Sequence, residues 1–295
     1  MTLERQEIEE TQPRIRNTPM RPRAWRELLE HDDIASVESE LGAILLADQD
    51  GQLNLHYAFA GQEEMRYQFA PMFEELSPEI DSFDAEYLRI DLVQVPDRIW
   101  IEPLLHAADF RDFGEWIDMV RPGLDPNAPP PEFPQGLAMR RAAPQDADGI
   151  VAIEAAAYGD FSDGEVSTRQ RLADGLWSGV LERNGELVAY AINGPVDRAE
   201  ARILSAAVDP EAAGDGLGRL VIEAAVYQLT ANEARSAVVR VRPELPQALK
   251  VSQAVGFSAG TGGVEWRRPA DEQEITERRE EEHSRGMKAR FGDWR

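Results

Sequence analysis

The chain has 295 residues, of which 42% are hydrophobic and none is cysteine, and its 55 acidic and 31 basic residues give a formal net charge of −24. This composition is enough for one large or two modest cores, and it excludes disulfide frameworks, thiolate metal sites and a cysteine nucleophile. The acidic balance argues against a nucleic-acid partner. The opening residues lack the apolar core of a signal peptide, and the longest charge-free stretch, 251–264, is Gly- and Ser-rich. We therefore expect a cytoplasmic protein with no membrane contact.

A proline-rich segment divides the chain. Residues 122–136 contain six prolines and two glycines, a composition that neither pairs as a strand nor continues a helix. It predicts a first domain at 1–121, a linker at 122–136, a second domain at 137–268 and a charged tail at 269–295 that is helical or disordered. Residues 1–136 carry 29 acidic and 11 basic residues, whereas 137–268 carry 18 and 14. Most of the acidity therefore lies in the first domain.

The first domain shows alternating strand and helix patterns. In chain order we expect a hairpin over 43–60 that turns at Asp50-Gly51, a helix over 63–76, a strand over 85–95, a helix over 97–110 and a final strand over 112–120. Trp100, Phe110, Phe113 and Trp116 are interpreted as core residues of this pattern rather than as a stacking platform.

The second domain predicts the order β-α-β-β-β-α-β-α-β. Its elements are a strand over 137–143, a helix over 145–159, a hairpin over 176–194 around Asn184-Gly185, a strand over 201–208, a helix from 217, a strand over 236–242, a helix over 246–254 and a strand over 263–268. Strand, Pro96, helix and Asp109-Phe110 in the first domain correspond to strand, Pro246, helix and Gly256-Phe257 in the second. We interpret this as an internal duplication, with chance similarity as the alternative.

The sharpest local motif is VDPEAAGDGLGR, residues 208–219, between a strand and an apolar-faced helix. Glycines at 214, 216 and 218 let successive backbone N–H groups point toward an anion at a helix N-terminus. A tight strand-to-helix turn that needs positive φ would require the same glycines. The dinucleotide fingerprint fails because Arg219 occupies its third glycine position, and no Gly-Lys-Ser/Thr follows for a P-loop.

These residues and the order of strands around them resemble the GCN5-related N-acetyltransferase (GNAT) family. The family signature is Arg or Gln, two residues, then Gly-x-Gly or Gly-x-Ala after the fourth strand, and Gly216-Leu217-Gly218 fits it. The opening strand and helix, RRAAPQDADGIVAIE, and the closing ALKVSQAVGF also fit, so the resemblance covers the whole second domain. It implies an α/β (α+β) fold with a mixed, largely antiparallel sheet flanked by helices, present here as two such domains in tandem.

The resemblance also implies a function: an acyl-CoA-dependent N-acyltransferase in which an amine of a small molecule or peptide attacks the thioester of acetyl-CoA directly. A splayed pair of parallel strands would admit pantetheine, and loop amides would hold the pyrophosphate. The alternative is a non-catalytic acyl-CoA sensor or interaction module of the same fold. For either function we expect a monomer or a homodimer. The implied cofactor-binding residues are Ala206, Val208, Ala213, Gly214, Asp215, Gly216, Leu217, Gly218 and Arg219.

The second domain departs from the family pattern at three positions. Ala213 occupies the Arg/Gln position, Leu245 stands where Asn is common, and Ser252 stands where many members have a Tyr that protonates the leaving thiolate. Ser252 is therefore a candidate proton relay, although a helical serine commonly bonds to the backbone instead.

Glu200 is the candidate base, because it begins the strand that leads into the loop and has the same parity as Ala206 and Val208. The alternative is an exposed acid at a hairpin edge. Glu154, Asp160 and Asp163 are further acids that would either pair with a cationic amine or remain solvated.

The first domain resembles the same family but lacks the glycine-rich loop, with only Gly61 available between its hairpin and helix. We therefore expect it to be a degenerate copy without a second cofactor site. The four histidines, at 31, 56, 106 and 283, show no metal-ligand spacing, so no metal is expected. In the tail, Glu274 with Arg278 and Glu281 with Arg285 have the spacing of helical ion pairs, and Trp294 is a candidate docking residue.

Overall fold

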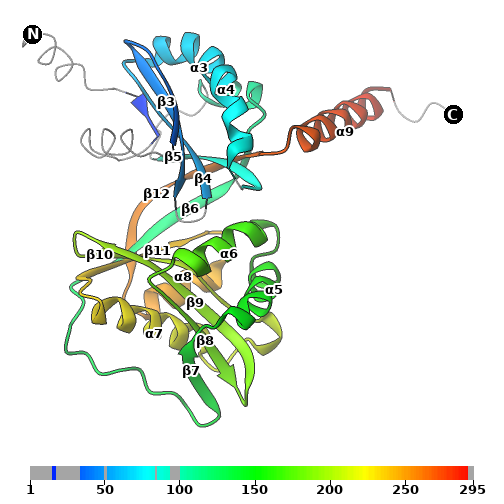
Figure 1. The fold of residues 1–295 in the computed structure, drawn as a ribbon. Helices are drawn as coiled ribbons and strands as arrows, with labels where there is room; N and C mark the ends of the chain where they lie inside the picture. Colours follow the sequence, from blue (N-terminus) through cyan, green and yellow to red (C-terminus); the bar gives the residue numbers. More distant parts are fainter. Residues whose placement is uncertain (1–14, 18–33, 50–51, 84, 94–99, 292–295) are drawn as a thin grey trace, which may run out of the picture. The chain divides into compact units, whose positions relative to one another are not determined.

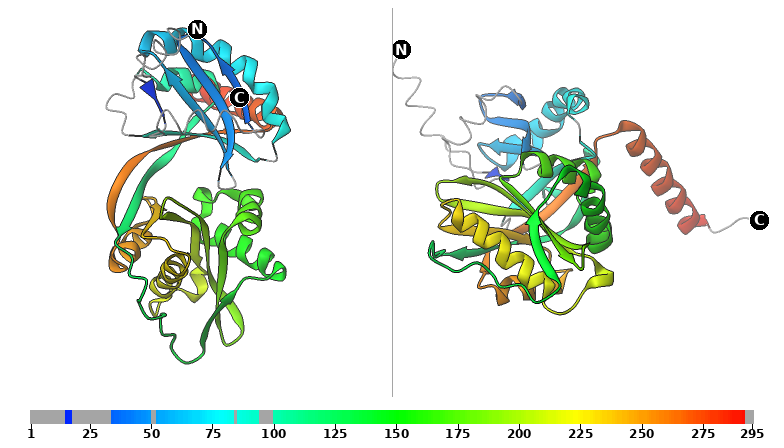
Figure 2. Two further views of the ribbon diagram at one scale, coloured as in Figure 1. Left: turned by 60° about the vertical axis from the view of Figure 1, so that its left-hand side comes forward. Right: turned by 60° about the horizontal axis from the view of Figure 1, so that its bottom comes forward.

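The computed structural model describes residues 15–17, 34–49, 52–83, 85–93 and 100–291. The chain forms two compact units: unit 1 contains Met1–Asp112 and Glu265–Arg295, and unit 2 contains Phe113–Val264 (Figures 1 and 2). Each unit has helices packed on a mixed sheet, as expected. The turn at Asp50-Gly51 and Trp294 lie outside the described residues.

Unit 1 contains a sheet with the strand order β2-β3-β4-β5-β12, and β1 pairs with β4. Its elements are β1 (Ile15–Arg16), β2 (Ile34–Glu38), β3 (Gly42–Gln49), β4 (Gln52–Phe59), α3 (Gln62–Leu76), β5 (Tyr87–Val93), α4 (Glu102–Ala107), and α9 (Glu272–Phe291). The helix expected over 97–110 is shorter: within the described part of that range, α-helix covers only α4.

Unit 2 contains the order β6-β11-β10-β9-β8-β7. Its elements are β6 (Arg111–Pro122), β7 (Leu137–Arg141), α5 (Ala147–Tyr158), α6 (Gly164–Asp174), β8 (Trp177–Arg183), β9 (Glu186–Asp197), β10 (Glu200–Val208), α7 (Leu217–Ala231), β11 (Ser236–Val241), α8 (Pro246–Ala254) and β12 (Ser258–Pro269). Asn184 and Gly185 have φ values of 54° and 89°, the left-handed geometry expected for the tight turn between β8 and β9. Helix α6 was not predicted.

Two long strands are divided between the units. The strand expected to close the first domain instead places its main part, Phe113–Pro122, in unit 2, where β6 runs antiparallel to β11. Conversely, β12 continues from unit 2 into unit 1 from Glu265 onward and lies next to β5. Each compact unit therefore includes a strand from the other side of the proline-rich segment. The domain boundaries 1–121 and 137–268 stay a prediction.

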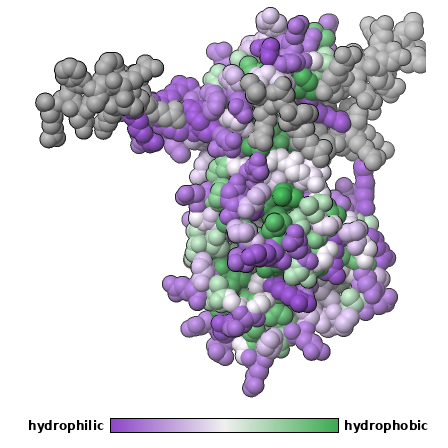
Figure 3. Space-filling model, turned by 180° about the vertical axis from the view of Figure 1, so that it is seen from behind, coloured by the Kyte–Doolittle hydropathy of each residue, from purple (hydrophilic) through white to green (hydrophobic). Residues whose placement is uncertain are grey.

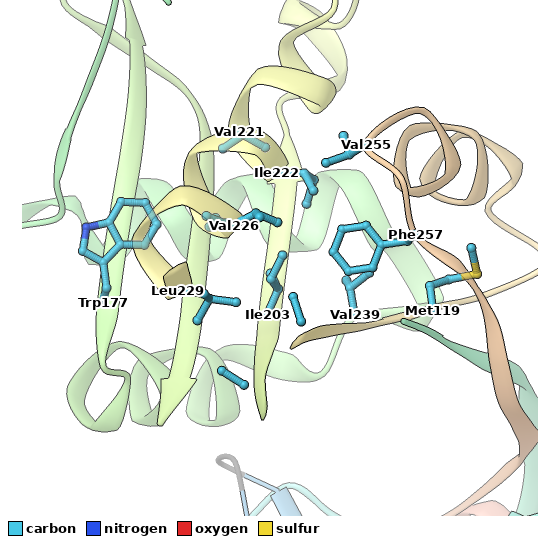
Figure 4. Close-up of a cluster of buried hydrophobic side chains, with 14 of the residues drawn as sticks. Met119, Trp177, Ile203, Val221, Ile222, Val226, Leu229, Val239, Val255 and Phe257 are labelled. Atoms are coloured by element: carbon cyan, nitrogen blue, oxygen red, sulfur yellow. The ribbon is translucent and has the colours of Figure 1, made fainter. Parts of the chain in front are cut away.

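The sheet of unit 2 has a core on each face. One cluster contains α7, the end of α8 and the facing residues of β10 and β11, and Figure 4 shows Val221, Ile222 and Val226 of α7 directed toward this sheet. The other lies under α5 and α6 and contains Ile150, Ile153 and Tyr190. Helices α5 and α7 thus present the apolar stripes that the sequence spacing predicts.

The surface reflects the composition. The face shown in Figure 3 carries hydrophilic residues interspersed with smaller hydrophobic areas, as expected for a chain with 29% charged residues. Within the ranges described above, no helix is long and apolar enough to cross a membrane.

Candidate functional site

The central feature of unit 2 is a strand that loses one neighbour halfway along its length. β10 pairs antiparallel with β9 from Glu200 to Val208, but it pairs in parallel with β11 only over residues 200–203. Residues 204–208 of β10 therefore have no strand partner on the β11 edge among the described residues. This is the splayed parallel pair that the family resemblance implies, and it leaves backbone groups available for a ligand.

The glycine-rich loop follows directly on this unpaired stretch. Asp209 accepts a hydrogen bond from the amide of Glu211 (2.9 Å), and Gly214 accepts one from the amide of Leu217 (3.1 Å). Across the part of the chain that the structure describes, no acceptor bonds to five other amides of the loop and first helical turn, those of Gly214, Asp215, Gly216, Gly218 and Arg219. Five unused donors at a helix N-terminus form a cradle of the kind that can bind an anion.

The backbone explains why glycine occupies this loop. Gly214 and Gly216 have φ values of 126° and 76°, and a Cβ on either would meet no other atom within 4 Å. Glycine is therefore needed at these two positions for its backbone conformation and not for lack of space. Gly218 differs, because a Cβ there would lie 3.3 Å from Val251 Cγ2, so its small size lets α7 and α8 approach closely. Asp215, with φ of 49°, tolerates the left-handed region better than most residues.

The remaining predicted cofactor residues surround this cradle. Ala206 and Val208 are half-buried on β10, and Ala213 is exposed in the loop. Asp215 pairs with Arg183 (3.2 Å), and Arg219 pairs with Glu223 (2.7 Å), both at exposed or partly exposed positions. Arg183 and Arg219 thus place basic side chains at this loop, whose Arg/Gln position is filled by Ala213.

Glu200 lies at the other end of β10. It is exposed, and its carboxylate accepts a bond from the Ser236 hydroxyl at 3.3 Å. Ala206 lies six positions further along the strand, roughly 20 Å away. The pairing of β10 with β9 also shifts register twice between Ala201 and Ser205.

These register shifts invert the alternation of side chains. Ala201 and Ile203 pack in the same core cluster as Ala206 and Val208, so odd positions before the shifts share a face with even positions after them. The parity argument for Glu200 is therefore wrong, and its role as a base stays a prediction that this geometry does not favour.

Ser252 is 3% exposed within α8, and its carbonyl accepts bonds from the amides of Val255 and Phe257. Its main visible role is to end the helix. A proton relay through its hydroxyl stays a prediction.

The three further acids that the sequence singled out have different surroundings. Asp160 is exposed, and Asp163 pairs with Arg171 at 2.8 Å. Glu154 is only 3% exposed, and its Oε2 accepts bonds from the hydroxyls of Ser205 (2.9 Å) and Tyr190. It follows Ile153 and lies one turn after Ile150, both buried, so its place on the apolar face of α5 was the available sequence signal.

Burial determines the protonation behaviour of this cluster. Desolvation, reinforced by the charge of Asp163, raises the pKa of Glu154, although bonds from Tyr190 and Ser205 and the charge of Arg171 oppose the rise. Desolvation and the Glu154 carboxylate raise the pKa of Tyr190 and of Tyr158. Glu154 therefore holds a proton more strongly than an ordinary glutamate, and both tyrosines stay neutral at physiological pH.

Unit 1 contains the counterpart of the splayed pair. β4 and β5 are paired in parallel only at Leu53 and Asn54, and β3 pairs with every residue of β4 along its other edge. β1 pairs with the end of β4, so it must lie on the edge that β5 leaves. The side chain of Asn17 continues this pairing: its Nδ2 donates to Leu55 O and its Oδ1 accepts from Tyr57 N, both at 2.8 Å. The opening in unit 1 is thus occupied by the chain itself.

Comparisons with known proteins identify the fold. Residues 148–257 match the family model of the acetyltransferase (GNAT) family, a range that includes the unpaired stretch of β10, the loop and α8. Residues 148–257 are therefore a GNAT-family domain within unit 2. No curated protein sequence matches the chain.

Solved structures share the fold of most of the chain. A GCN5-related N-acetyltransferase from Kribbella flavida is 18% identical, with a TM-score of 0.55 over 83% of this chain and 92% of its own. A tandem GNAT protein from the clavulanic acid biosynthesis pathway is also 18% identical, with a TM-score of 0.54 over 90% and 92%. A Drosophila protein is 16% identical, with a TM-score of 0.57 over 77% and 74%. The predicted tandem arrangement of two GNAT-like folds is confirmed.

Proposed function

We propose that the protein is an acyl-CoA-dependent N-acyltransferase that transfers the acetyl group of acetyl-CoA directly to an amine of a small molecule or peptide. The observation that carries this proposal is the adjacency, in the GNAT domain, of an unpaired edge on β10 and a loop with five unused amides. The edge suits the amide groups of pantetheine, and the loop suits a pyrophosphate. Direct attack requires no acyl-enzyme, and a chain without cysteine is compatible with that route.

The proposed site lies in unit 2 alone. In unit 1 the loop between β4 and α3 is short, with Gly61 as the helix N-cap, and residues 15–17 occupy the edge of β4. We propose that unit 1 is the degenerate member of the pair and that it holds no acyl-CoA.

Calorimetry with acetyl-CoA tests the site. Gly216→Val places a branched side chain at a left-handed position of the loop, so we expect the affinity for acetyl-CoA to fall at least tenfold. Gly185→Val is the matched control, because Gly185 also has positive φ and open space around it but lies in the hairpin between β8 and β9. Equal affinities for the two variants, or no binding by the wild type, would contradict the site.

A second candidate, a non-catalytic acyl-CoA sensor, is favoured by one observation: Ser252, at the family's general-acid position, is buried in α8. Release of free CoA in the presence of a panel of amines separates the two candidates. Turnover with any amine supports the enzyme, whereas acetyl-CoA binding without turnover across polyamines, amino sugars and peptides supports the sensor.

A further inference from the structure

Helix α5 places two polar side chains against consecutive residues of the unpaired stretch of β10. Glu154 accepts a hydrogen bond from Ser205 Oγ at 2.9 Å, and one turn later Tyr158 Oη donates to the carbonyl of Ala206 at 2.7 Å. Tyr190 of β9 completes the group, because its Oη lies 2.7 Å from Ser205 Oγ and also bonds to Glu154 Oε2. A carboxyl group and three hydroxyls thus lie beside the segment where the proposed function places the pantetheine arm of acetyl-CoA.

The titratable and charged groups that face Glu154 come from α5, β9 and α6. Tyr158 lies on the same helix, Tyr190 comes from β9, and the Asp163–Arg171 ion pair comes from the start and last turn of α6. The Glu154 carboxyl, 3% exposed, is therefore shielded from bulk water. The carboxyl connects to the unpaired edge through Ser205, which is 7% exposed.

The contacts do not by themselves require a carboxylate. Both hydroxyls donate to the same oxygen, Oε2, and the amide oxygen of a glutamine would accept the same two bonds. Burying an ionisable group where a neutral one would serve costs stability, so its presence points to proton chemistry.

We propose that Glu154 is the proton acceptor of the acyl-transfer step and acts through the hydroxyl of Ser205. This inference rests on the proposed function. The amine nitrogen forms a bond to the thioester carbon and the carbon–sulfur bond breaks. As the nitrogen loses its proton to Ser205 Oγ, Ser205 passes its own proton to Glu154 Oε2. CoA leaves as a thiolate and takes a proton from solvent, and Glu154 returns its proton to solvent before the next turnover.

Glu154→Gln in the full chain tests the relay, because it keeps the two hydrogen bonds and removes the proton acceptor. With acetyl-CoA and the best amine of the panel, we expect kcat to fall roughly 100-fold, the acid-side inflection of the pH profile to disappear, and the Kd for acetyl-CoA to remain unchanged. Glu165→Gln, at an exposed position of α6 paired with Arg169, is the control and should keep the wild-type profile. A wild-type pH profile in Glu154→Gln would overturn the relay.

Two serine variants test the path of the proton. Ser205→Ala removes the connection between the edge and Glu154, so we expect a loss of kcat similar to that of Glu154→Gln with an unchanged KM for acetyl-CoA. Ser178→Ala removes an equally buried hydroxyl from β8 that has no hydrogen-bond partner within the described structure, and it should leave kcat unchanged. Full activity of Ser205→Ala would exclude this path.

An infrared titration provides a readout that needs no turnover. The difference between wild-type and Glu154→Gln spectra isolates the carboxyl band of Glu154, which we expect to titrate at a higher pH than an ordinary glutamate. Titration in the ordinary range would contradict a poised acceptor. If the band titrates as expected but the wild type acetylates no amine, the proposed function and the relay both fail. If the wild type does acetylate an amine and Glu154→Gln has the same pH profile as the wild type, only the relay is overturned.

Discussion

Asp109 and Gly256 end corresponding helices in the two units with the same backbone geometry. Their φ values are 64° and 90°, and in both cases the next residue, Phe110 or Phe257, is buried. The amide of each phenylalanine bonds to the carbonyl five residues earlier, at 2.9 Å and 3.0 Å. This is the hydrogen bond of a Schellman motif. The motif supports the internal duplication over chance similarity.

The left-handed backbone conformation of Gly256 predicts how a substitution there changes stability. We expect Gly256→Ala to destabilise the protein by about 1–2 kcal/mol, because alanine is strained at positive φ and the nearest side-chain atom, Arg121 Nε at 3.7 Å, adds no clash. Gly149→Ala is the matched control, since Gly149 lies in the first turn of α5 and alanine favours a helix. Urea denaturation should show a loss for the first variant and no loss for the second.

The raised pKa of Glu154 predicts how stability depends on pH. The folded state binds the Glu154 proton more tightly than the unfolded state, whose carboxyl has the usual pKa of 4.5. The stability from this group is therefore complete below pH 4.5 and is lost as the pH rises through the folded-state pKa, by about 1.4 kcal/mol for each unit of difference. Glu154→Gln removes this dependence. Denaturation curves across pH should show the wild type losing stability relative to the variant, and parallel curves would refute the shift.

At the scale of elements, α9 belongs to unit 1 through a few specific contacts. Ile275 is 1% exposed, Arg279 forms an ion pair with Asp109, and Arg278 Nη2 donates to the carbonyl of Asp109 at 2.5 Å. The tail is thus helical, and the Glu281–Arg285 pair expected from spacing forms at 2.7 Å. Arg278, which was expected to pair with Glu274 along the helix, also bonds to Asp109 outside α9.

The buried position of Ile275 predicts that α9 stabilises unit 1. We expect Ile275→Ala to cost about 2–5 kcal/mol, because it deletes a buried aliphatic side chain. Glu277→Ala, at an exposed position of the same helix, should change stability by less than about 0.5 kcal/mol. Both variants should bind acetyl-CoA as the wild type does, which calorimetry would check.

The sequence predicts elements better than it predicts their irregularities. The hairpin of β8 and β9, the helix from Pro246 to Ala254 and the glycine loop follow from turn residues and periodicity, which are local properties. The register shifts in β10 are not visible in the sequence, because most residues of ARILSAAV are apolar and the pattern does not fix which of them share a face. Helix α6 was missed because its sequence, GEVSTRQRLAD, is mostly polar, with Thr168 and Arg171 as its buried residues.

In the candidate site, too, local features were predictable from the sequence and features that depend on tertiary packing were not. The loop amides were predictable because glycines at strand-to-helix junctions have a local signature. The Glu154 cluster depends on three elements meeting, α5, β9 and β10, and the sequence indicated only that Glu154 lies on an apolar helix face. Which acid is buried is decided by tertiary packing.

At the scale of the whole molecule, neither half of the chain contains all of a unit. Unit 2 includes Trp116 and Met119 of β6, exposed by 2% and 0%, and unit 1 includes Trp266 of β12, exposed by 1%. A cut in the proline-rich linker would leave each fragment without a buried strand of its unit.

This arrangement predicts the behaviour of fragments. Expressed separately, residues 1–136 and 137–295 should each fail to give a cooperative unfolding transition, because each lacks core residues and exposes a strand edge. Co-expression should give a complex with the circular dichroism and acetyl-CoA binding of the intact chain. A fragment 137–295 that folds and binds acetyl-CoA by itself would show that β6 is dispensable.

The segment 15–17 that occupies the edge of β4 acts, in thermodynamic terms, as a tethered ligand. Asn17 is 2% exposed and bonds to the backbone of β4 on both sides of His56, and its effective concentration is set by the chain rather than by the solution. The stability it gives to unit 1 is therefore independent of metabolite levels. On the proposed function, acyl-CoA stabilises unit 2 as its concentration rises, by about 2.7 kcal/mol at one hundred times Kd. Acetyl-CoA should bind with a stoichiometry of one per chain, and the midpoint of unit 2 unfolding should follow the acyl-CoA supply.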